Sequence, residues 1–130
     1  MSRPDLSRQS SSPEYWHAET RSDSVVVMNI PGLLSRAREF DIDVSVVVAV
    51  PSHAQDPVSA SWHELTLEVD GRRQWSRRVP SHNPGESDGL DYHLRLRLEA
   101  GQSVRVRALA GCQGSQIRRL LIEARENLSD

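Results

Sequence analysis

Histidine and cysteine are the side chains of this chain most able to hold a metal ion or to act as a nucleophile. None of the five histidines belongs to an HxH, HxxxH or HExxH pair, the spacings that place two ligands on one metal ion. They are His17, His53, His63, His82 and His93. The single cysteine, Cys112, has no CxxC mate, so a cysteine–histidine pair would need a histidine brought to it by the fold. We expect no catalytic residue, no metal site and no cofactor; a metal-dependent enzyme built on the histidines is the third alternative.

Aromatic side chains near strand ends form a second candidate set, because an indole or phenol ring stacks on a sugar or on a partner surface. Trp62 stands where a proline-containing loop meets an alternating segment, and Tyr15 and Trp16 stand where a polar segment meets the first apolar run. Tyr92 opens another alternating segment, whereas Trp75 falls among core-like positions. Trp62, Tyr15, Trp16 and Tyr92 are therefore candidate ligand-binding residues.

Arginine supplies a third set, concentrated in residues 92–109, YHLRLRLEAGQSVRVRAL. Side chains on a strand point alternately to opposite faces, so each half of this segment has one apolar and one cationic face. We predict that the halves pair as a β-hairpin around Gly101, in the left-handed conformation that glycine favours. The cationic face of this hairpin adds four candidate ligand-binding residues: Arg95, Arg97, Arg105 and Arg107.

The predicted hairpin sets Arg95 opposite Arg105 and His93 opposite Arg107. Like charges directly opposite one another destabilise a sheet, so anionic groups must lie nearby. An internal source is available in the outward-facing carboxylates of other strands, at Asp41, Asp43, Glu64 and Glu68. The alternative is that the arginine face meets an anionic ligand or a partner protein.

All sixteen basic residues are arginine, and eighteen acidic residues give a net charge of −2. The guanidinium group suits carboxylate, phosphate and aromatic partners, but a GC-rich coding bias explains the same usage. A chain with this balance has no general attraction to nucleic acid, which is therefore not expected as a partner.

Alternation and turn residues predict the remaining elements. Strands are expected at 24–30, 40–50, 62–69, 72–79 and 117–125, and residues 33–39 are expected to form two helical turns. Asp70-Gly71 is a hairpin turn with two alternative registers. A two-residue turn pairs Glu68 with Arg73 and Glu64 with Arg77, whereas a three-residue loop sets Leu65 opposite Trp75. We favour the second register because it buries Trp75.

About seven or eight strands punctuated by glycine and proline predict an all-β fold, a single antiparallel β-sandwich of jelly-roll type. We expect a flexible polar tail at residues 1–14, the sandwich at 15–126 and a C-terminal tail at 127–130. A single cysteine and the lack of a long apolar run predict a cytoplasmic protein with no membrane segment.

The second half of the chain resembles the galactose-binding-like jelly roll found in several carbohydrate-binding modules. The resemblance rests on three segments: ELTLEVDG at 64–71, DYHLRLRLEAGQSVRVRA at 91–108 and QIRRLLIEA at 116–124. It implies that ligands meet the loops at one sandwich edge or the concave face.

These observations predict a non-enzymatic binding module for a carbohydrate or small polar ligand, with the aromatic candidates as platforms and the arginines as donors. The alternative is a protein-interaction or homo-oligomeric assembly subunit that uses the arginine-bearing sheet face or a sheet edge.

Overall fold

The computed structural model describes residues 12–51, 61–81 and 85–128, and within these ranges the regular structure is entirely β. The described ranges contain no helix that could cross a membrane. The strands are β1 (Tyr15–Thr20), β2 (Val25–Ile30), β3 (Arg38–Ala49), β4 (Trp62–Val69), β5 (Arg72–Pro80), β6 (Ser87–Leu98), β7 (Val104–Gln113) and β8 (Gln116–Glu126).

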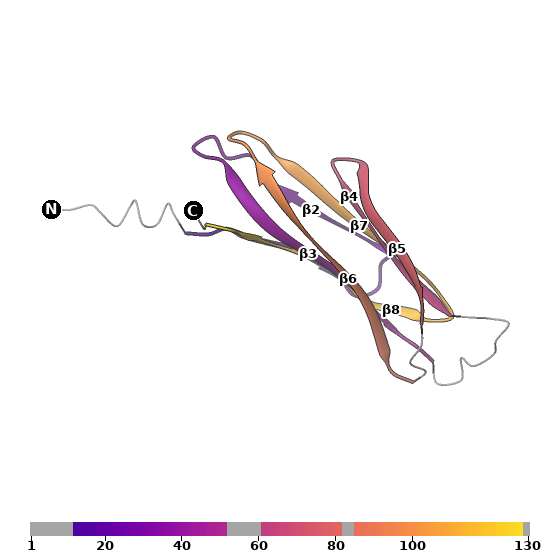
Figure 1. Ribbon diagram of the computed structural model, residues 1–130. Helices are drawn as coiled ribbons and strands as arrows, with labels where there is room; N and C mark the ends of the chain where they lie inside the picture. The colour runs from indigo at the N-terminus through magenta and orange to yellow at the C-terminus, as the bar shows by residue number, and fades with distance from the viewer. Residues whose placement is uncertain (1–11, 52–60, 82–84, 129–130) are drawn as a thin grey trace.

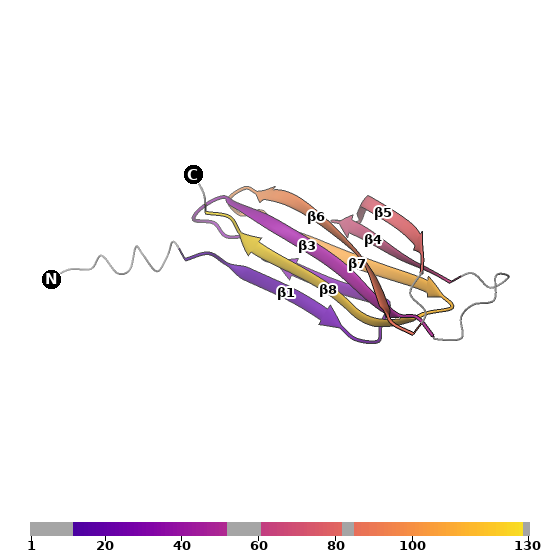
Figure 2. The ribbon, with the colours of Figure 1, turned by 60° about the horizontal axis from the view of Figure 1, so that its bottom comes forward.

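The strands form two antiparallel sheets packed face to face (Figures 1 and 2). Sheet A has the order β1-β8-β3-β6, which Figure 2 shows from its outer side, and sheet B has the order β2-β7-β4-β5. Every connection except β4–β5 passes from one sheet to the other. This topology is an eight-stranded jelly roll, so the predicted sandwich is confirmed.

The core lies between the sheets and is built from strands that alternate apolar and polar residues. Along β3, Ile42, Val44 and Val46 are buried, while Asp41, Asp43 and Ser45 face outward, as their spacing predicted. Burying each such aliphatic side chain contributes about 1.5–3 kcal/mol. This alternation therefore decides which residues remain on the two outer faces, where a ligand can reach them.

The β4–β5 hairpin has the tight turn that Asp70-Gly71 predicts, but its register differs from the one we favoured. Both turn residues have positive φ, 50° at Asp70 and 83° at Gly71, the requirement of a type I′ turn. Glu68 pairs with Arg73, and a β-bulge between Leu67 and Glu68 then shifts the register by one residue. As a result Leu67, not Leu65, lies opposite Trp75, and Arg77 lies opposite Leu65 rather than Glu64.

The predicted hairpin of residues 92–109 is wrong, because β6 belongs to sheet A and β7 to sheet B. Gly101 has the expected positive φ of 81°, but its turn carries the chain across the core. The apolar faces of β6 and β7 therefore look toward each other instead of lying side by side. Arg95 is paired with Asp41 on β3 and Arg105 with Asn29 on β2, so the predicted arginine–arginine pair does not form.

Residues 33–39 form a turn and the start of β3 rather than two helical turns. Backbone contacts with the β6–β7 loop hold this segment: Gly101 N donates to Leu33 O at 2.8 Å. A Cβ on Gly32 would lie 2.5 Å from Gly101 O, so the two loops pack backbone to backbone. A helix here would withdraw Leu33 O from this contact.

Candidate functional site

The two outer faces of the sandwich differ in charge, because β6 and β7 belong to different sheets. The predicted single arginine face is therefore wrong: Arg95 and Arg97 lie on the outer face of sheet A, and Arg105 and Arg107 lie on that of sheet B. On sheet A the outward carboxylates outnumber the arginines. On sheet B the described residues include four outward arginines, at 73, 78, 105 and 107, against the carboxylates of Glu64 and Glu68 and of Asp70 in the β4–β5 turn.

Carboxylates on β3 pair with His93 and Arg95 of β6, as the outward acidic stripes predicted, whereas Arg97 pairs with Glu99 just beyond its own strand. Arg95 Nε donates to Asp41 Oδ1 at 2.9 Å, and His93 Nδ1 lies 2.9 Å from Asp43 Oδ1. Arg97 Nε donates to Glu99 Oε2 at 2.7 Å. Exposed pairs of this kind contribute about 0–1 kcal/mol each to stability. They neutralise the surface charge locally, so these three side chains do not indicate a ligand site.

Tyr15 is an exposed aromatic side chain on this same face, at the edge strand β1. Its hydroxyl donates to Glu123 Oε2 at 2.5 Å, and the guanidinium of Arg125 lies 5.4 Å from its ring centroid. The hydrogen bond to Glu123 raises the pKa of Tyr15 above its ordinary value of 10.0. His17 stacks on the ring at a centroid distance of 5.5 Å, so Tyr15 is engaged within its own sheet.

Two other predicted aromatic residues, Tyr92 and Trp16, pack against the core. Tyr92 stacks on Trp75 with ring centroids 4.4 Å apart and planes 12° from parallel, and both rings pack against the core. Trp16 also packs against the core, and its indole N–H donates to Glu14 Oε1 at 3.0 Å. Tyr92 and Trp16 are therefore partly buried, Tyr92 with its ring stacked and Trp16 with its indole N–H bonded within the protein.

Trp62 lies at a hollow of about 280 Å³ on the outer face of sheet B, where β4 begins. The walls are Ser61, Trp62, Arg78, Val79 and Pro80. The Arg78 guanidinium lies 3.6 Å from the centroid of the indole ring, and Trp62 Nε1 donates to Gln113 Oε1 at 3.0 Å. An aromatic ring and a guanidinium thus line one shallow hollow, and the Gln113 amide holds the indole N–H beside it.

A second, larger hollow of about 670 Å³ lies where β3 ends and β8 begins. Among the described residues its lining includes Pro51, Glu86, Gln116 and Arg118 but no aromatic side chain. Without an aromatic ring among these residues, it offers no stacking surface of the kind that Trp62 provides.

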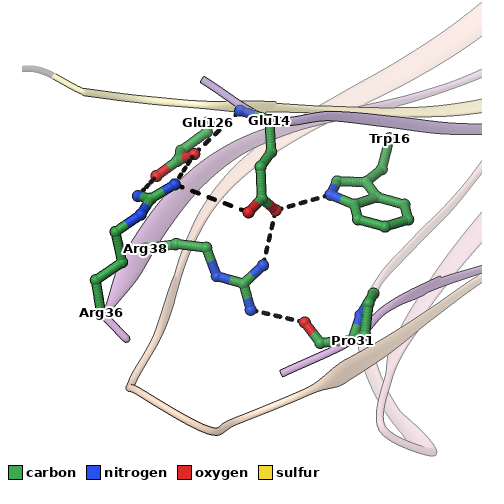
Figure 3. Close-up of polar contacts among 6 residues, drawn as sticks. All are labelled: Glu14, Trp16, Pro31, Arg36, Arg38 and Glu126. Carbon is green, nitrogen blue, oxygen red and sulfur yellow. Dashed lines mark hydrogen bonds and ion pairs between the residues drawn. The ribbon is translucent and has the colours of Figure 1, made fainter. Parts of the chain in front are cut away.

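A cluster of four charged side chains joins the first and last residues of the sandwich (Figure 3). Glu14 Oε1 accepts hydrogen bonds from Trp16 Nε1 at 3.0 Å and from Arg38 Nη1 at 2.7 Å. Glu126 binds Arg36 through both carboxylate oxygens and accepts from Glu14 N at 3.0 Å. We call Glu14, Arg36, Arg38 and Glu126 the terminal clasp.

The terminal clasp is partly buried, and its hydrogen bonds connect several strands. The Arg38 and Glu126 side chains are each only 1% exposed. Arg38 Nη2 also donates to Pro31 O at 2.7 Å, and hydrogen bonding by Arg36 lowers the pKa of Glu126 from 4.5. These contacts tie β1, β3 and β8 to the loop after β2.

Sequence reasoning missed the terminal clasp, although a signal for it was present. Arg38 is in phase with Phe40 and Ile42, the inward positions of β3. Glu126 is in phase with Ala124 on β8. A charged residue at a core position of a strand needs a buried partner, so this phase pointed to paired charges.

The described histidines are engaged separately. His63 is fully buried, with Nδ1 2.8 Å from Ser81 Oγ and Nε2 3.3 Å from Gly89 O. The fold does set Cys112 opposite His63, but the Cys112 thiol donates to Ser115 O at 3.2 Å. His53 and His82 lie outside the described residues, and within the described ranges no three metal-ligating side chains gather.

No family model and no curated protein matches this chain. Among solved structures, it matches dimeric latent PorU from Porphyromonas gingivalis with a TM-score of 0.54 and 10% identity. That match covers 88% of this chain but only 12% of PorU, so the chain spans a small part of its relative. At this identity the likeness shows the fold.

Two carbohydrate-binding modules are matched over nearly their whole length. A family 35 module from Clostridium thermocellum has a TM-score of 0.36 at 12% identity, with 85% of this chain and 97% of that chain covered. The CBM36-1 domain of a xylanase from the hindgut metagenome of Trinervitermes trinervoides has a TM-score of 0.40 at 7% identity, with 85% and 96% covered.

Proposed function

We propose that this chain is a β-sandwich binding module that takes a carbohydrate at the Trp62 hollow. The observation that carries the proposal is the indole of Trp62 beside Arg78 and Ser61 at one hollow of about 280 Å³, with the indole N–H held by Gln113 Oε1. A sugar ring has an apolar face for the indole and hydroxyls for the polar groups. Such a mixture of one aromatic surface and a few placed polar groups is typical of small-ligand sites.

Arg78 covers one face of the Trp62 ring, so a stacked sugar must displace it. The Arg78 side chain is 54% exposed, and its contact to Glu64 Oε1 is 3.3 Å long. An exposed ion pair of this kind contributes about 0–1 kcal/mol, and an exposed cation–π contact about 0.5–1 kcal/mol. Displacement is therefore cheap, and the freed guanidinium can donate hydrogen bonds to ligand hydroxyls.

A glycan array followed by tryptophan-fluorescence titration tests the proposal. We expect Trp62→Ala to weaken binding of any glycan hit by about tenfold or more, corresponding to about 1.4 kcal/mol. Tyr15→Ala is the matched control, since it removes an exposed aromatic ring from the opposite face. An array without hits, or a Trp62→Ala variant that binds like the unmodified protein, would overturn the proposal.

A further inference from the structure

A small cavity on the outer face of sheet B lies at the end opposite Trp62, beside the β4–β5 turn. Its volume is about 70 Å³, and Glu68, Gly71, Arg105 and Arg107 line it. A buried water needs about 10–15 Å³, so the cavity admits a group larger than water but smaller than a sugar ring. Gly71 leaves its turn side open, because a Cβ there would meet nothing within 4 Å.

The arginines at this cavity are incompletely neutralised. Arg107 Nη1 lies 3.8 Å from Glu68 Oε1, too far for a hydrogen bond. Arg107 Nε is buried and has no hydrogen-bond acceptor among the described residues. The Arg105 guanidinium forms no ion pair in the part of the chain that the structure describes, although the Asp70 carboxylate accepts a hydrogen bond from the Arg105 backbone N–H at 2.9 Å. Arg73, opposite Glu68, likewise forms no ion pair in that part.

Guanidinium N–H groups without a hydrogen-bond acceptor, placed around a small cavity, favour one kind of ligand group. A buried N–H that lacks an acceptor is costly, and an anionic oxygen is its strongest acceptor. A sulfate or carboxylate group offers several such oxygens to Arg105 and Arg107 together. A neutral hydroxyl offers one weaker acceptor and leaves the excess positive charge in place.

The position of the cavity links it to the Trp62 hollow. Both lie on the outer face of sheet B along β4, one at Trp62 and the other at Glu68. At about 3.3 Å per residue they are roughly 20 Å apart, a span that an extended oligosaccharide can bridge.

We propose that the Arg105–Arg107 cavity is a subsite for the anionic group of the ligand, and that the ligand is an acidic saccharide carrying sulfate or carboxylate groups. This inference rests on the proposed function and specifies its ligand class. One sugar of the chain stacks on Trp62, and an anionic group farther along it accepts hydrogen bonds from Arg105 and Arg107.

Matched polysaccharide pairs test the inference on the full chain by calorimetric titration. Dextran sulfate is compared with dextran of equal length, and polygalacturonate with its methyl ester. We expect each acidic polymer to bind at least about tenfold more tightly than its neutral match. Replacing either arginine should weaken binding of the acidic polymer by about tenfold. The variants are Arg105→Gln and Arg107→Gln. Arg95→Gln is the control, because it removes the same charge from sheet A.

The outcomes separate the two proposals. If acidic and neutral polymers bind equally in a Trp62-dependent way, the acidic-saccharide inference is wrong and the proposed function stands. Equal losses in Arg95→Gln and Arg105→Gln would overturn the subsite by showing general charge attraction. Polyglutamate binding as tightly as the acidic polymers, without dependence on Trp62, would replace both proposals with an acidic protein partner.

Discussion

Glu14→Gln is the most informative perturbation of the terminal clasp, because it removes one charge and keeps the shape of the side chain. The Arg38 guanidinium, whose side chain is 1% exposed, then loses the carboxylate 2.7 Å away. Leaving a buried charge unpaired costs about 3–5 kcal/mol. The glutamine amide oxygen can still accept from Arg38 and Trp16, so we expect a loss of about 2–3 kcal/mol in the free energy of unfolding.

Urea unfolding followed by circular dichroism and tryptophan fluorescence measures this loss as a lower midpoint at an unchanged slope. For a domain of this size, the melting temperature should fall by roughly 8–12 °C. Adding Arg38→Met removes the buried charge itself, so the double variant should be more stable than Glu14→Gln alone.

Asp43→Asn is the control for Glu14→Gln, since it neutralises a carboxylate that is 51% exposed and paired with His93. Its cost should be about 0–1 kcal/mol. The reasoning is refuted if Glu14→Gln costs no more than Asp43→Asn, or if Arg38→Met fails to restore stability.

Two further predictions concern pH and backbone packing. Hydrogen bonding by Arg36 lowers the pKa of Glu126 from 4.5, so its stabilisation is complete above pH 4.5 and is lost as the pH falls through the lowered pKa. Urea titrations at a series of acidic pH values should show that the free energy of unfolding falls less steeply with pH in Glu126→Gln than in the unmodified protein. An unchanged pH profile would contradict a stabilising role of the Glu126 carboxylate. Gly32→Ala should cost about 1–3 kcal/mol in thermal or urea unfolding, because the new methyl would lie 2.5 Å from Gly101 O. Gly111→Ala, whose methyl meets side-chain atoms no closer than 3.4 Å, should cost less, and equal losses would rule out the backbone clash.

The sequence predicted which residues of each strand face inward, because the alternation is local. Ile42 and Val44 on β3, like Leu65 and Leu67 on β4, are buried where their spacing placed them. The same alternation does not determine which strands are neighbours in a sheet. β6 and β7 have the same inward apolar faces whether they pair within one sheet or lie in opposite sheets. The alternation therefore does not distinguish a hairpin from a crossing between the sheets.

Register and site geometry depended on features that have no local signal. The bulge beside Leu67 shifts Trp75 by one position, although the Asp70-Gly71 turn itself was correct. Arg105 and Arg107 were proposed as ligand residues together with Arg95 and Arg97, but only the fold separates the two pairs onto different faces. The counter-charge of Arg95 comes from Asp41, 54 residues away, so no short window of sequence contains both, whereas Arg97 pairs with Glu99 two residues away.

The unequal outer faces also give the described part of the sandwich an uneven distribution of charge between its two sides. The net charge of −2 and a pI near 6.2 describe the chain as a mildly acidic protein. Near a negatively charged surface, however, we expect the outer face of sheet B, with its arginines, to turn toward that surface. The outer face of sheet A, with its carboxylates, would then face bulk water. Its adsorption would therefore have a fixed orientation that bulk isoelectric behaviour does not reveal.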